Sequence, residues 1–95
     1  METNKKPLFE LGIEISTPGA IEELRKARVS FGEILKRHTH GDWGDLCKED
    51  KEQNELALKE GGRILSAYTL PTGGKLWVIT EADRSATTII KPDEY

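Results

Sequence analysis

The stretch from residue 63 to residue 90 constrains the fold more than any other part of this sequence. It holds three runs rich in β-branched and aromatic residues. Two turn signals separate the runs, Pro71-Thr72-Gly73-Gly74 and Glu81-Ala82-Asp83-Arg84. Such runs, joined by short connections rich in turn residues, form neighbouring antiparallel strands. The stretch therefore predicts a three-stranded antiparallel β-meander.

The residues before the meander predict one more strand. Leu11, Ile13 and Ile15 alternate with Gly12 and Glu14, which is the period of a β-strand. This strand could join the meander as a fourth, edge strand.

Three helices are predicted between this strand and the meander. Thr17 followed by Pro18 is a helix start, and Ser30 with Glu33 forms a capping box for a second helix. A third helix covers residues 48–60. The sequence thus predicts an α+β fold with an N-terminal strand, three helices and then a three-stranded antiparallel β-meander. We expect a single domain over residues 8–95 after a flexible tail at residues 1–7.

Composition limits the classes of function. Charged residues make up 33 % of the 95 residues, apolar residues 36 %, and the net charge is −3. A chain without a broad basic patch is not suited to sequence-independent binding of nucleic acid. Cys47 is the only cysteine, so an intrachain disulfide and a cysteine zinc site are excluded. The polar N-terminal residues predict no signal peptide or membrane span, and we expect a cytoplasmic protein without a cofactor.

The run His38-Thr39-His40-Gly41-Asp42 is the one segment typical of metal chemistry. It resembles the H-x-H-x-D-H run of metallo-β-lactamase-type hydrolases, but Trp43 stands where the last histidine belongs. Because the chain has only two histidines, we favour a buried His38, a solvent-exposed His40 and no metal site.

The loop Gly41-Asp42-Trp43-Gly44-Asp45 has two open interpretations. In the structural one, Trp43 fills the gap between helices and sheet, and Asp42 and Asp45 bond nearby backbone amides. In the functional one, the loop presents Trp43 for recognition. Its binding candidates are then His40, Asp42, Trp43 and Asp45. We favour the structural interpretation.

An enzymatic alternative depends on the second turn of the meander. A helical half followed by an antiparallel sheet with Glu81 and Arg84 resembles small metal-independent ribonucleases of the barnase and RelE kind. Their general acid–base groups and arginines gather on the sheet. His38 or His40 could then supply the acid, and the catalytic candidates of a ribonuclease or toxin-like enzyme are His40, Glu81 and Arg84.

Both faces of the meander carry apolar residues. With an even number of residues connecting the first two strands across Gly73-Gly74, one face holds the bulkier set. That set is Ile64, Tyr68, Leu70, Trp77 and Ile79, which we assign to the core. The opposite face would carry Leu65, Ala67, Leu76 and Val78 as interface candidates. A bare apolar face predicts a weak homodimer or a partner protein.

Three segments resemble one family of short bacterial proteins. The segments are residues 38–45, residues 62–68 and residues 77–85. The family is often carried on plasmids and other mobile elements, and its members are called plasmid-related proteins. The resemblance implies a bacterial, mobile-element context and provides no catalytic assignment to transfer to this chain. The expected function is a non-enzymatic protein-interaction or accessory module, with the small ribonuclease as the alternative.

Overall fold

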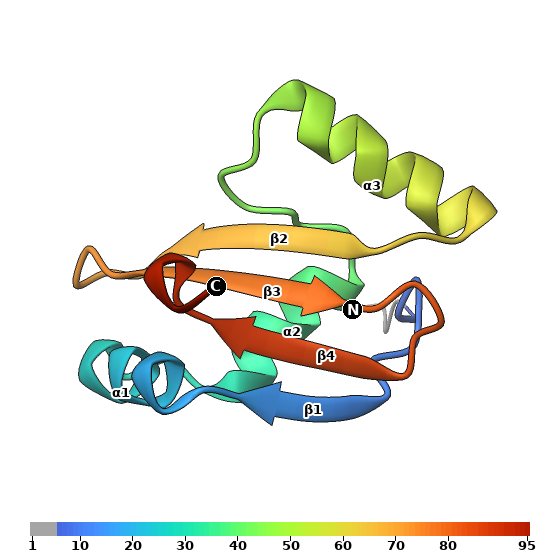
Figure 1. Ribbon diagram of the computed structural model, residues 1–95. Helices are drawn as coiled ribbons and strands as arrows, with labels where there is room; N and C mark the ends of the chain where they lie inside the picture. Colours follow the sequence, from blue (N-terminus) through green and yellow to red (C-terminus); the bar gives the residue numbers. More distant parts are fainter. Residues whose placement is uncertain (1–5) are drawn as a thin grey trace, which may run out of the picture.

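The computed structural model describes residues 6–95, so most of the predicted N-terminal tail lies outside the described residues. The chain forms an α+β fold with four strands and three α-helices (Figure 1). In chain order the elements are β1 (Ile13–Ser16), α1 (Pro18–Ala27), α2 (Phe31–Thr39), α3 (Lys48–Glu60), β2 (Ile64–Thr69), β3 (Lys75–Thr80), β4 (Ala86–Ile90) and a 3-10 turn η1 (Pro92–Glu94).

The sheet is four-stranded and mixed, with the strand order β1-β4-β3-β2. β2, β3 and β4 are antiparallel neighbours, as the sequence predicts. The description of the sheet as a three-stranded antiparallel meander is incomplete, because β1 pairs in parallel with β4. A short turn fixes the direction of the next strand, whereas a long connection leaves it open. The whole of α1 to β3 separates β1 from β4.

All three helices begin where the sequence predicts, and two of them have the predicted side-chain caps. The Thr17 hydroxyl accepts a hydrogen bond from the Ala20 amide at the start of α1, at 3.1 Å. The Ser30 hydroxyl accepts one from the Glu33 amide at the start of α2, also at 3.1 Å. Each cap satisfies an amide that the first helical turn leaves without a partner.

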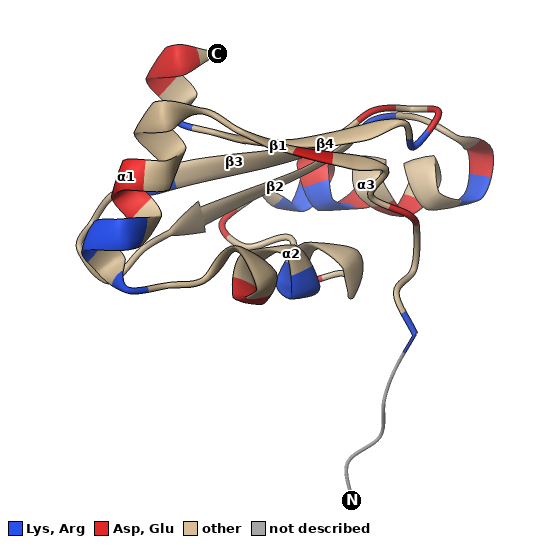
Figure 2. Cartoon of the chain, turned by 90° about the horizontal axis from the view of Figure 1, so that it is seen from below, with Lys and Arg blue, Asp and Glu red and all other residues tan. Residues whose placement is uncertain are grey.

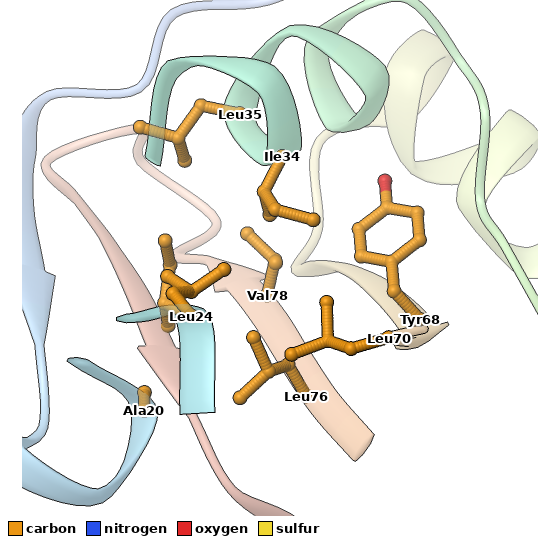
Figure 3. Packing of buried hydrophobic residues seen from close by; sticks show 9 residues of the cluster. Ala20, Leu24, Ile34, Leu35, Tyr68, Leu70, Leu76 and Val78 are labelled. Carbon is orange, nitrogen blue, oxygen red and sulfur yellow. The ribbon is translucent and has the colours of Figure 1, made fainter. Parts of the chain in front are cut away.

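One face of the sheet is the core. α2 lies across this face and α1 stands at one end of the sheet (Figure 2). Figure 3 shows side chains from both helices meeting those of the strands. The main cluster consists of Ala20, Leu24, Ile34, Leu35, Tyr68, Leu70, Leu76, Val78 and Ile89. A second cluster of Phe9, Trp43, Ala57 and Ile64 joins β2 to α3.

The predicted faces of β3 are reversed in the structure. Thr69 pairs with Lys75, so five residues connect β2 to β3. An odd connection turns every β3 side chain to the face opposite to that given by an even one. Leu76 and Val78 are therefore fully buried within the chain and are not interface residues. Trp77 and Ile79 take their place on the opposite face.

Among residues 6–95, no helix is long and apolar enough to span a membrane.

Candidate functional site

The side of the sheet opposite α2 is the candidate site, and we call it the open face. The register places eleven side chains on it: Ile13 and Ile15 of β1, Leu65, Ala67 and Thr69 of β2, Lys75, Trp77 and Ile79 of β3, and Ala86, Thr88 and Ile90 of β4. Figure 2 shows no α-helix packed over this side, where η1 stands at one end.

Several side chains of the open face remain accessible. Ile13 is 69 % exposed and Ile15 is 47 % exposed, although both are strand isoleucines. Leu65 and Trp77 are half-buried. Ile79 is buried although it points to this side, so its neighbours already cover it. Exposed apolar side chains scattered over a surface are ordinary, but a contiguous set on one sheet face is typical of an interaction site.

A hollow of about 300 Å³ lies on the open face at the side of β2 and β3. Leu65, Trp77 and Ile79 line it together with Tyr95, whose ring meets the Trp77 ring edge-on at 5.5 Å. Arg63 stands at its rim and donates a hydrogen bond to the Tyr95 hydroxyl at 3.3 Å. An apolar lining with a few polar groups suits an apolar side chain of a partner better than a charged ligand.

The loop at residues 41–45 covers the outer edge of β2. The Ala67 amide donates to the Trp43 carbonyl at 3.1 Å, and the Asp45 amide donates to the Ala67 carbonyl at 2.7 Å. The Asn54 side chain of α3 bonds both backbone groups of Leu65, at 2.6 and 3.1 Å. These bonds satisfy backbone groups that an edge strand would otherwise offer to another chain.

The binding-loop candidates have structural partners in this arrangement. Trp43 is 4 % exposed, stacks on Phe9 at 6.3 Å, and donates its indole N–H to the Glu55 carboxylate at 3.0 Å. Asp42 accepts a hydrogen bond from Arg37 at 2.6 Å, which lowers the pKa of this carboxyl. Asp45 accepts one from the Thr69 hydroxyl at 2.7 Å. The structure thus supports the interpretation of Trp43 as a plug.

His38 belongs to a buried polar chain beneath the sheet. The Thr87 hydroxyl donates to the Leu11 carbonyl at 2.8 Å, so it accepts from Thr80 at 2.7 Å. Thr80 in turn accepts from the Nε2–H of His38 at 2.9 Å, and Nδ1 accepts from Ser66 at 2.6 Å. The order of donors therefore places a ring proton on Nε2, and in the neutral ring Nδ1 is the acceptor.

The surroundings of His38 keep the ring neutral. Phe9 lies edge-on to it at 5.1 Å and Trp43 at 6.1 Å. Burial lowers the pKa of His38 to about 4, because an apolar site disfavours the charged imidazolium. The ring is fully buried, so its pairing with a serine does not form a nucleophilic dyad that a substrate could reach.

The candidates for ribonuclease chemistry do not form a common site. The Arg84 guanidinium donates to the carbonyls of Gly62, Glu81, Ala82 and Ala57. Glu81 pairs with Arg63 at 3.4 Å at the end of β3. His40 follows α2, and its Nδ1 lies 2.8 Å from the Lys36 carbonyl oxygen. The cavity of about 410 Å³ that His40 lines contains neither Glu81 nor Arg84.

Within residues 6–95, no group of three His, Cys, Asp or Glu side chains could hold a metal ion. The structure separates the two histidines of the metal-like run. His38 points into the core and is fully buried, whereas His40 is half-buried at the end of α2.

Comparisons with family models, curated proteins and solved structures find no match to this chain.

Sequence reasoning missed two features. It assigned Trp77 and Ile79 to the core, because the odd length of the hairpin connection cannot be read from Gly73-Gly74 alone. It also missed the polar chain of His38. A signal for it exists, since Ser66 stands between inward-facing Ile64 and Tyr68 in a strand of period two.

Proposed function

We propose that this chain is a non-enzymatic protein-interaction module that binds through the open face. The proposal rests on one observation, the apolar side of a sheet that no α-helix covers and that η1 and Tyr95 cover only in part, while the other side already holds the core (Figure 2). Trp77 is half-buried and Ile13 is 69 % exposed on this face, so a partner that covers them removes further apolar surface from water, which is favourable.

The ribonuclease alternative has less support. A phosphate-binding arginine needs free N–H groups aimed at the ligand. Arg84 is half-buried, and its guanidinium N–H groups donate to backbone carbonyls. These hydrogen bonds hold the connection between β3 and β4 against the end of α3. Its φ of 62° belongs to that turn. We therefore regard Arg84 as a clamp that holds these segments together.

Site-specific photo-crosslinking in cells of the source organism tests the proposal. A photoreactive phenylalanine replaces Ile13 on the open face, and in a matched control it replaces Phe31. Phe31 is also exposed, at 41 %, but it begins α2 on the other side of the sheet. We expect adducts of higher mass from position 13 and few from position 31. Equal yields at the two positions, or none at either, would contradict a binding role of the open face.

A further inference from the structure

The charges of the open face lie only at its two ends. Across the middle, the register aligns Ile15, Thr88, Ile79 and Leu65 in one row without a charged side chain. Arg63 and Glu81 form an ion pair at one end of β2 and β3. A partner that covers the middle of this face must therefore be apolar there itself, because burying an unpaired charge against it is strongly unfavourable.

β3 carries this pattern along its own length. Its outward positions read Lys75, Trp77, Ile79 and then Glu81, a cation and an anion with two apolar residues between them. When β3 of a second copy lies antiparallel across β3 of the first, the pattern is complementary to itself, because each charge of one copy lies opposite the other charge of its partner. Stacked in the same direction, it would place like charges against each other.

The charges at the two ends of β2 support the same antiparallel stacking. Beside Lys75, the Thr69 hydroxyl accepts from its ammonium group at 3.2 Å and donates to Asp45 at 2.7 Å. Arg63 lies at the opposite end of β2. An antiparallel stacking of two copies therefore brings Arg63 of one copy towards the Thr69–Asp45 end of the other.

We propose that the partner of the open face is a second copy of this chain, docked face to face so that Lys75 of each copy lies opposite Glu81 of the other. This proposal rests on the proposed interaction function and names its partner. A two-fold axis generates both Lys75–Glu81 contacts from one surface, which is the condition for a closed homodimer. The two sheets would pack as aligned layers.

The size of the face makes this dimer a weak one. Four strands spaced about 4.8 Å apart and about 18 Å long offer roughly 350 Å² of sheet plane. Side-chain relief adds to this area, and η1 with Tyr95 takes up part of it (Figure 2). Stable interfaces bury roughly 800 Å² on each partner, so we expect dissociation at micromolar to millimolar concentrations.

Sedimentation equilibrium of the purified chain, with charge-swap variants, tests the arrangement. Lys75→Glu and Glu81→Lys each replace two attractive contacts by two repulsive ones. Each alone should weaken dimerisation about tenfold at low salt. An equimolar mixture of the two variants restores both contacts, so it should form heterodimers about as readily as the wild type dimerises. Lys48→Glu, at the start of α3, is the matched control and should change little. Circular dichroism checks that each variant folds.

Two results would overturn the proposal: a wild-type monomer at about 1 mM protein, or a mixture that associates no better than its components. These outcomes are distinct from a failure of the interaction function. If the purified chain is a monomer and position 13 crosslinks in cells to a protein of another mass, the open face remains a binding surface. Its partner is then a different protein and not a second copy.

Discussion

His38 should make the stability of this protein fall between about pH 7.5 and pH 5. Burial lowers the pKa of its ring to about 4, whereas an unfolded histidine titrates near 6.5. Between these values the unfolded chain binds a proton that the folded chain does not. The free energy of unfolding therefore decreases as the pH falls, by at most about 1.4 kcal/mol per pH unit.

Integrated from about pH 7.5 to pH 5, this difference amounts to about 2 kcal/mol. That is a large part of the roughly 5–15 kcal/mol by which small domains are stable. Carboxyl groups whose pKa the fold lowers add little in this window. The pKa of Asp42, for example, is lowered by its hydrogen bond from Arg37, so the stability it contributes is lost only below its ordinary value near 4.

Urea unfolding followed by circular dichroism at several pH values measures this effect. His38→Gln cannot titrate at this position, so its free energy of unfolding should be nearly flat over the same range, whatever its value at neutral pH. An NMR titration of the His38 ring in the wild type measures the pKa directly and does not depend on the variant folding. A ring that titrates near 6.5, or equal pH slopes for the two proteins, would refute the assignment of a buried neutral histidine.

Three further predictions follow from the packing. Trp43→Ala should lower the free energy of unfolding by about 3–5 kcal/mol, as large aromatic truncations do, and Trp77→Ala on the open face should lower it less in the same urea titration. Val78→Lys buries a charge beneath α2 and should abolish the cooperative thermal transition, whereas Thr88→Lys on the open face should retain it. Arg84→Ala leaves four carbonyls without this donor and should cost about 1–3 kcal/mol. Arg84→Lys should not recover the loss in melting temperature, because an ammonium cannot reproduce the planar fork.

Local sequence signals determined the elements of this fold. Thr17 and Ser30 cap their helices through contacts with residues only three positions away, and these contacts form in any chain that begins a helix there. The two turns of the β-rich stretch also lie where Gly73-Gly74 and the Asp83-Arg84 pair indicate them. The burial of the His38 side chain was also predicted, from its place on the apolar face of its helix.

Tertiary structure decided what local signals leave open. The connection of five residues between Thr69 and Lys75 set the phase of β3, and a change of one residue there exchanges its two faces. The parallel pairing of β1 with β4 likewise depends on tertiary packing. The helices and strands that lie between the two strands in sequence leave the direction of their pairing open. The open face exists for the same reason: both faces of the strands are apolar, so sequence alone does not say which one α2 covers. Only the phase of β3, fixed by its pairing with β2, put Val78 inside and left Trp77 at the surface.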